Sequence, residues 1–150
     1  MDEHDRKITD LLAADARRSL ADIGSVVGLS PSAVNDRIRR LTATGTLRRF
    51  TVEADPEALG VPVLVFVWVA LRDGADEAGF HRFARQHPAI IECHHVTGGW
   101  SYLIKLRVAA IGRIEDFLAD LKAGGFLGRS ETVLALSSPV PGPFVPAGEG

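Results

Sequence analysis

The chain has 150 residues, of which 46% are hydrophobic and 24% are charged, and its formal net charge at pH 7 is −2. This composition is typical of a folded globular protein, and the length suffices for one ordinary domain or two small ones. The charge excludes a strongly basic protein that coats DNA without specificity. The single cysteine, Cys93, excludes an intrachain disulfide and a cysteine-rich zinc site.

A first helix is predicted to begin after Asp2, because Asp2 and Asp5 have the spacing of a capping box. Ile8, Leu11 and Leu12 form its apolar stripe. The charged start predicts no secretory signal. We therefore expect a cytoplasmic protein.

Two further helices are predicted between Ser19 and Gly45. The first runs to about Val27, and Gly28 supplies the turn after it. The second begins after the N-cap Ser30 with Pro31 in its first position. The residues expected to face inward are Leu20, Ile23 and Val27 in the first of these helices and Val34, Ile38 and Leu41 in the second. Two short helices joined by a tight turn that contains glycine are typical of a helix-turn-helix, whose second helix lies in the major groove of DNA.

The outward face of that second helix carries side chains that can read DNA. Asn can bond adenine, Asp can accept from cytosine, Ser can bond either kind of group, and Arg can bind guanine or phosphate. The candidate DNA-binding residues of this segment are Ser30, Ser32, Asn35, Asp36, Arg37, Arg39 and Arg40. From Arg37 to Arg49 all five charged residues are arginines, which predicts salt-dependent attraction to phosphate.

Residues 47–52 are predicted to form a short strand, a wing whose Arg48 and Arg49 reach the adjacent DNA backbone. Helix pairs with exposed arginines also occur in proteins that do not bind DNA. The spacing by itself leaves both interpretations open.

The second half predicts a ferredoxin-like βαββαβ domain after a connector at residues 51–60. The expected order is strand 61–71, helix 76–87, strand 90–97, strand 101–108, helix 112–123 and strand 131–137. The apolar run 61–71 is too short to cross a membrane and is rich in β-branched and aromatic residues, so it is read as a strand. Pro- and Gly-rich residues 139–150 are expected to form an extended or disordered tail.

Both faces of strand 61–71 are apolar, which predicts a second copy of the chain. Val63, Val65, Val67 and Val69 point one way, and Leu64, Phe66, Trp68 and Ala70 point the other. The helices can cover only one face of the sheet. An exposed apolar face of that size is rare in monomers, so we expect a homodimer.

The chain resembles the Lrp/AsnC family of bacterial and archaeal transcription regulators. The residues that carry the resemblance are Asp2, Asp5, Arg6, Lys7 and Ile8; Ile23 and Val27 to Ser32; Arg37, Ile38, Leu41, Gly45 and Leu47; and Asp55, Pro56, Leu59 and Gly60. The second half matches in organisation. The resemblance implies a DNA-binding domain at 1–50, a connector at 51–60, an effector-binding and dimerisation domain at 61–138 and a tail at 139–150. It also implies double-stranded DNA as a partner and a homodimer that can build an octamer of four dimers.

The resemblance further implies a small-molecule effector, commonly an amino acid, at the turn between the second and third strands. The matching residues are Thr97, Gly98, Gly99, Trp100, Ser101 and Tyr102. This chain departs from the family pattern, because Gly99 and Ser101 stand where acidic residues are usual. Neither residue can pair with a ligand ammonium group. A Gly-Gly hairpin turn with Trp100 buried at a subunit contact explains the same residues without any effector.

An enzyme is the alternative function. Sirohaem decarboxylases are similar to this family in both halves, and His94 and His95 are compatible with that interpretation. Adjacent residues on a strand point to opposite faces, however, so these two histidines cannot ligate one metal from a regular strand. We expect no catalytic residues, no metal and no cofactor.

Overall fold

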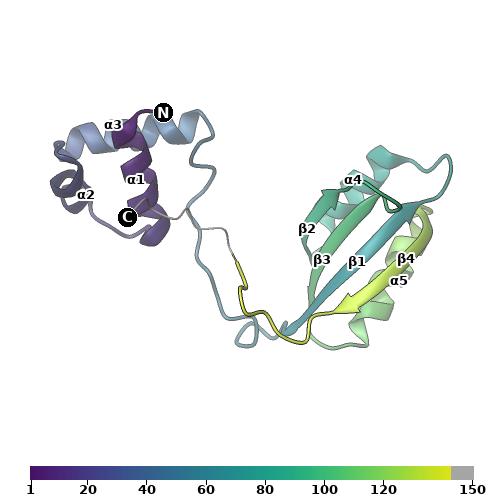
Figure 1. The fold of residues 1–150 in the computed structure, drawn as a ribbon. Coiled ribbons are helices and arrows are strands. Elements are labelled where there is room, and N and C mark those ends of the chain that lie inside the picture. The colour runs from purple at the N-terminus through teal and green to yellow at the C-terminus, as the bar shows by residue number, and fades with distance from the viewer. Residues whose placement is uncertain (143–150) are drawn as a thin grey trace. The chain divides into compact units, whose positions relative to one another are not determined.

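A computed structural model describes residues 1–142 and divides the chain into two compact units, with the boundary between Glu53 and Ala54 (Figure 1). Of the predicted tail 139–150, residues 143–150 lie outside the described residues. Residues 139–142 contain no helix or strand.

The first unit consists of three helices, α1 (Glu3–Ala14), α2 (Leu20–Val27) and α3 (Pro31–Ala43). Each begins at a side-chain N-cap, which is Asp2 for α1, Ser19 for α2 and Ser30 for α3. The predicted capping box at Asp2 is confirmed, because Asp2 and Asp5 each accept a hydrogen bond from the backbone N–H of the other. One apolar side chain from each helix is fully buried where the three meet; these are Ile8, Ile23 and Val34.

The turn between α2 and α3 depends on two glycines. Gly28 adopts φ 70°, a left-handed conformation that costs other residues energy. Gly24 lies on the buried side of α2, where the carbonyl oxygen of Leu29 comes so close that an added Cβ would stand 2.5 Å from it. The absence of a side chain at Gly24 therefore lets the turn fold back tightly against α2.

The prediction of a wing strand at residues 47–52 is wrong, because the structure has no strand there. The backbone N–H of Leu47 donates to the carbonyl of Leu41, which turns the chain back against the end of α3. No described segment pairs with residues 48–52, and an extended segment without a ladder partner does not form a sheet.

The second unit has the predicted βαββαβ order (Figure 1). Its elements are β1 (Val63–Leu71), α4 (Glu77–Gln86), β2 (Ile90–His95), β3 (Tyr102–Val108), α5 (Arg113–Ala123) and β4 (Leu127–Leu134). The last strand begins four residues earlier than predicted and ends before Leu136, which is fully exposed. The sequence of β4 mixes polar and apolar residues and therefore indicates a strand only weakly. Backbone pairing with β1, rather than a run of apolar side chains, defines this strand.

The four strands form one antiparallel sheet in the order β2-β3-β1-β4. Helices α4 and α5 cover one face and bury the valines of β1 at positions 65, 67 and 69. Phe80 of α4 and Phe117 of α5 are the largest buried side chains between helices and sheet. The predicted ferredoxin-like arrangement is therefore confirmed.

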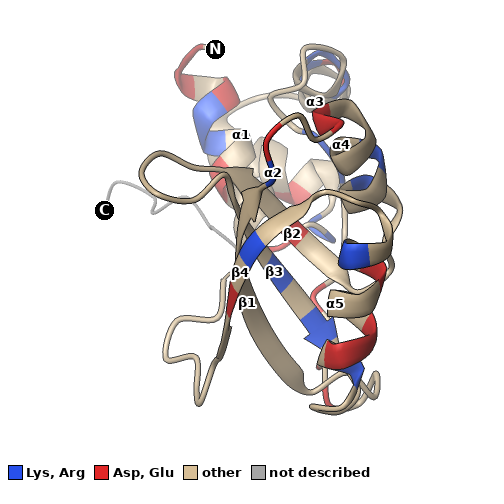
Figure 2. Cartoon of the chain, turned by 90° about the vertical axis from the view of Figure 1, so that its right-hand side faces the viewer, with Lys and Arg blue, Asp and Glu red and all other residues tan. Residues whose placement is uncertain are grey.

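The opposite face of the sheet is not covered by any described helix or strand of this unit. Phe66 and Trp68 of β1 are only partly buried there, and Val133, which pairs with Phe66, is 44% exposed. In the strand register, Phe66 pairs with Lys105 of β3 and Leu64 pairs with Arg107. Figure 2 shows the basic positions of β3 in blue. We call this side of the sheet the open face.

The close approach at Gly24 generates a stability prediction. Replacing a mid-helix glycine by alanine ordinarily stabilises a helix by roughly 0.5–1 kcal/mol. Gly24→Ala should instead destabilise the first unit by about 1–3 kcal/mol, because the new methyl group meets backbone that cannot move aside cheaply. Urea denaturation followed by circular dichroism measures this. Ser25→Ala, at an exposed position of the same helix, is the control, and equal stability of Gly24→Ala and wild type would contradict the argument.

Candidate nucleic-acid interface and effector turn

One exposed face of α3 carries four polar side chains, three of which have no partner among the described residues. Ser32, Asn35, Asp36 and Arg39 are all exposed. Within residues 1–142, the side chains of Asn35, Asp36 and Arg39 make no hydrogen bond or ion pair. These three groups are therefore free to bond to another molecule.

Ser30 has a structural role at the start of this face. Its hydroxyl accepts a hydrogen bond of 3.2 Å from the backbone N–H of Ala33 and lies 3.0 Å from the hydroxyl of Ser32. This contact caps α3 and holds Ser32 at the first turn of the helix.

The two flanking arginines of α3 are bound to α1. The guanidinium of Arg37 donates to Asp2 at 2.6 Å and to Asp5 at 2.8 Å. Arg40 donates from one nitrogen to both carboxylate oxygens of Asp5, each at 2.9 Å. Asp5 is only 2% exposed, whereas the Arg40 side chain is 57% exposed. Arg37 is therefore largely occupied within the protein, while Arg40 is held by one end and exposed at the other.

These contacts change the acidity of both carboxyl groups. The hydrogen bond from Arg37 and the helix N–H of Asp5 lower the pKa of Asp2 to about 2. Burial alone would raise the pKa of Asp5, but the hydrogen bonds from Arg37 and Asp2 and the charge of Arg40 outweigh it, so the pKa lies below its ordinary value. Both aspartates are ionised at neutral pH.

Sequence reasoning did not find the contact between Asp5 and the arginines. Asp5 was assigned only to the capping box, and all five arginines of 37–49 were assigned to DNA. The available signal was an acidic pair at the N-terminus of one predicted helix and a basic pair on another, which does not specify contact until the helices are packed.

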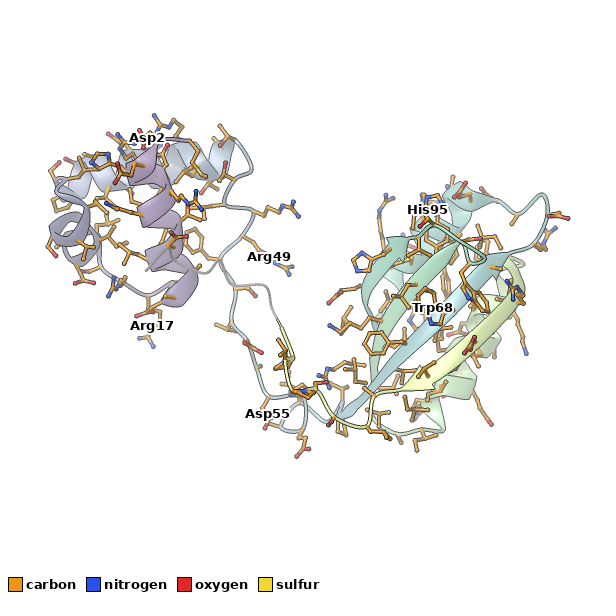
Figure 3. All side chains as sticks on the ribbon, viewed as in Figure 1. Asp2, Arg17, Arg49, Asp55, Trp68 and His95 are labelled. Carbon is orange, nitrogen blue, oxygen red and sulfur yellow. The ribbon has the colours of Figure 1, made fainter. Side chains whose placement is uncertain are left out.

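Arg48 and Arg49 follow α3 in the irregular segment and are exposed. Neither makes an ion pair or side-chain hydrogen bond within the described residues. The side chain of Arg49 extends away from the three helices (Figure 3). Both arginines remain available to phosphate although the predicted wing strand is absent.

The six residues predicted to form an effector site do not lie on one surface. Thr97, Gly98 and Gly99 are exposed, and Trp100 is partly buried. Ser101 is bonded to β1 instead. Its backbone N–H donates to the carbonyl of Val69 at 2.8 Å, and its hydroxyl accepts from the backbone N–H of Leu71 at 3.1 Å. Ser101 therefore fixes the turn to the end of β1.

Tyr102 belongs to the core under the helices and is 2% exposed. Its hydroxyl donates to Glu77 at 2.6 Å and lies 2.6 Å from a ring nitrogen of His81. Burial, with the adjacent Glu77 carboxylate, raises the pKa of Tyr102 to about 12. Its ring stacks on that of His95, with 4.8 Å between the ring centroids. Tyr102 is thus not accessible from the turn.

Trp100 belongs to a cluster that sequence reasoning missed. Its ring centroid lies 6.4 Å from that of Trp68, which is labelled on β1 in Figure 3. The guanidinium carbon of Arg129, on β4, lies 4.1 Å from the centroid of the Trp100 ring. Arg129 was not a candidate because the strand pairing that brings β4 to the turn is not visible in the sequence.

The histidines of β2 have separate partners. His94 lies 3.1 Å from Glu92, and His95 stacks on Tyr102 on the other face of the strand. No group of three or more potential metal ligands occurs among residues 1–142. In the same part of the chain, no helix is long and apolar enough to cross a membrane.

Comparison with known protein families matches both units. The AsnC-type helix-turn-helix domain matches residues 1–42, and the Lrp/AsnC ligand binding domain matches residues 64–144. The second match alone covers more than half of the chain.

Individual relatives agree with these matches. The HTH-type transcriptional regulator FL11 of Pyrococcus horikoshii is 33% identical, over 79% of this chain and 78% of its own length. The leucine-responsive regulatory protein of Escherichia coli is 34% identical, over 80% of this chain and 74% of its own length. Among solved structures, leucine response regulatory protein LrpA of Mycobacterium tuberculosis superposes with a TM-score of 0.85 at 28% identity, covering 97% of this chain and 100% of that one.

The exposed face of α3 and the matches together define a DNA-binding transcriptional regulator with a ligand-binding domain. The chain belongs to the Lrp/AsnC family. Its relatives are regulators and not enzymes, so the sirohaem decarboxylase alternative is not retained.

The pairing of Asp5 with Arg37 and Arg40 predicts acid sensitivity. Asp5→Asn should lower the free energy of unfolding of the first unit at pH 7 by roughly 1.5–3 kcal/mol, the range for hydrogen bonds to charged groups. Because the folded pKa is depressed, the stabilisation is complete above the unfolded pKa of about 4 and is lost as pH falls below it.

Denaturant unfolding between neutral pH and about pH 3 tests this, since wild type should lose more stability than Asp5→Asn over that range. Asp10→Asn, on α1 at a position whose side chain makes no hydrogen bond or ion pair within the described residues, is the matched control. Parallel pH profiles for wild type and Asp5→Asn would show that the carboxylate does not stabilise the fold.

Proposed function

We propose that α3 reads operator DNA through Ser32, Asn35, Asp36 and Arg39. The observation that carries this assignment is the exposed face of α3, on which Asn35, Asp36 and Arg39 have no partner among the described residues. Leaving hydrogen-bonding groups free at a protein surface suits recognition of base edges, which offer complementary donors and acceptors.

The remaining candidate residues serve the same interface in other ways. Arg48 and Arg49 contact phosphate, as does the exposed end of Arg40, whose other end is held by Asp5. An arginine fixed in this way loses less side-chain freedom on binding phosphate than a free one. Arg37 and Ser30 orient α3 rather than bind DNA, because Ser30 caps the helix and Arg37, whose side chain is only 24% exposed, is held by Asp2 and Asp5.

The open face of the sheet forms the homodimer contact. It exposes Phe66 and Val133 without cover from the described part of the unit, while Trp68 on the same face lies against Trp100 of the turn. Pairing two such faces removes apolar surface from water and places two copies of α3 on one DNA molecule. Half-sites one helical turn apart, about 34–36 Å, suit such a dimer. Size measurements on the purified protein distinguish a dimer from an octamer of four dimers.

A small-molecule effector modulates DNA binding from the turn at residues 97–100. The turn is exposed and two of its residues are glycines, which leave room for a ligand close to the backbone. The names of two relatives, the leucine-responsive regulatory protein and the glutamate uptake regulatory protein of Zymomonas mobilis, make an amino-acid-like effector the first class to test. A regulator of chromosomal genes acts in the cytoplasm at the nucleoid, where we place this protein.

The first experiment measures binding of the purified protein to the DNA upstream of its own gene against random competitor DNA at several salt concentrations. Selective retention with a steep salt dependence supports sequence-specific binding with several phosphate contacts. Equal binding to both DNAs at every salt concentration contradicts the assignment of α3 as a reader of that operator.

Two arginine variants separate base reading from phosphate contact. Arg39→Ala should weaken operator binding by about 1–3 kcal/mol with a smaller effect on random DNA, if Arg39 contacts a base. Arg48→Ala should weaken binding to all sequences about equally and reduce the salt slope. Fluorescence anisotropy with both DNAs measures the two effects. Arg85→Ala, on α4 in the other unit, is the control, and wild-type operator affinity in both variants contradicts the assignment.

The dimer assignment predicts that a charge on the open face separates the subunits. Val133→Asp should produce monomers, because two carboxylates would be buried in an apolar contact. Light scattering after size-exclusion chromatography measures the mass. Val26→Asp is the matched control, since Val26 is 54% exposed on α2. A dimer of unchanged stability in Val133→Asp would mean that the subunits pair elsewhere.

A further inference from the structure

The charge at the effector turn comes from β4 and is positive. Arg129 donates a hydrogen bond of 2.6 Å to the carbonyl of Gly99 and lies over the ring of Trp100. These two contacts orient the guanidinium and occupy one of its nitrogens. Its other nitrogens have no partner within residues 1–142.

No acidic side chain makes an ion pair with Arg129 among the described residues. The positions of the turn nearest to Arg129 are Gly99 and Trp100, neither of which is acidic. The closest acidic residue along β4 is Glu131, which pairs with Trp68 in the strand register and makes no ion pair with Arg129. Glu92, on the open side of β2, is already paired with Lys105 at 2.8 Å.

Because Gly99 has no side chain, the turn offers no anionic partner to the guanidinium of Arg129. A Cβ built on Gly99 would stand 3.5 Å from the Nη2 atom of Arg129, an ordinary van der Waals distance, with no other heavy atom of the surroundings nearby. A side chain therefore fits at this position, and an acidic one would lie directly against Arg129. The glycine keeps that place open to a molecule from outside.

Two indole rings form the apolar part of the same surface. Trp68 and Trp100 are both partly exposed and lie side by side. An aromatic surface beside a guanidinium suits a planar or apolar body that carries a carboxylate, because the ring faces bind the body and Arg129 binds the charge.

We propose that the effector of this regulator is a carboxylate with an aromatic or apolar body and that Arg129 binds its charge. This inference rests on the proposed function, since it specifies the ligand of the proposed effector turn. It narrows the ligand class by making the carboxylate essential for binding.

Three small molecules with the same phenyl ring distinguish the effect of a carboxylate on binding from that of an ammonium group. Phenylacetate carries only the carboxylate, phenethylamine only the ammonium, and phenylalanine both. The chain contains two tryptophans, Trp68 and Trp100, so its entire tryptophan fluorescence reports on this surface. Phenylacetate and phenylalanine should change the fluorescence saturably, and phenethylamine should have no effect. Saturable binding of phenethylamine, or no binding of phenylacetate, would overturn the proposal.

Variants of the full-length protein test the role of Arg129. Arg129→Gln should weaken phenylacetate binding by about ten- to a hundredfold, as expected for loss of a charge-assisted hydrogen bond. Gly99→Asp should have a similar effect by pairing with Arg129 internally, while Gly99→Asn, of nearly the same size, should retain binding. Arg113→Gln, at an exposed position of α5, is the charge-matched control. Unchanged affinity in both Arg129→Gln and Gly99→Asp would overturn the assignment.

DNA binding by the same preparations distinguishes a failure of the ligand inference from a failure of the DNA-binding assignment. A protein that binds its operator but not phenylacetate disproves this inference and leaves the DNA assignment intact. A protein that binds phenylacetate through Arg129 but no operator disproves the DNA assignment and leaves the ligand chemistry in place.

Discussion

The carboxylate of Asp5 is the interaction on which the geometry of the DNA-binding unit depends. It is buried at the start of α1, accepts the backbone N–H of Asp2 in the capping box and binds two arginines of α3. A buried carboxylate is costly unless its hydrogen bonds are complete, and here α3 supplies them. The orientation of α3 is therefore tied to the N-terminus of the chain. The polar side chains that face outward are left free by the same arrangement, because the arginines toward α1 satisfy the internal charge.

A second constraint acts on the other unit, where one sheet must bury two apolar faces. Helices α4 and α5 cover the valines of β1, and the alternation along the strand leaves Phe66 and Trp68 on the open face. The proposed dimer and the proposed effector surface both use this face and its adjoining turn. One sheet can in this way connect subunit pairing with ligand binding, since Trp68 belongs to the apolar face and also contacts Trp100.

Much of the fold was predictable because it depends on local patterns. Caps at Asp2, Ser19 and Ser30 mark helix starts, and the alternation of Val65, Val67 and Val69 marks a strand with a buried face. The errors occurred where an element depends on a distant partner. Residues 47–52 have the composition of a strand but no ladder partner among the described residues, whereas β4 has a polar sequence and is a strand because β1 pairs with it.

For the candidate sites too, local features were predictable from the sequence and long-range contacts were not. By itself the sequence determined the helix-turn-helix, the outward position of Asn35, Asp36 and Arg39, and the absence of acidic residues at positions 99 and 101, because helical periodicity and residue identity are local properties. Only the tertiary structure decided that Arg37 and Arg40 bind Asp5, that Tyr102 lies in the core, and that Arg129 reaches Gly99 and Trp100. Each of these contacts joins residues about 25 or more positions apart or depends on the packing of helices against the sheet, and the long-range packing that creates them has no counterpart in local spacing.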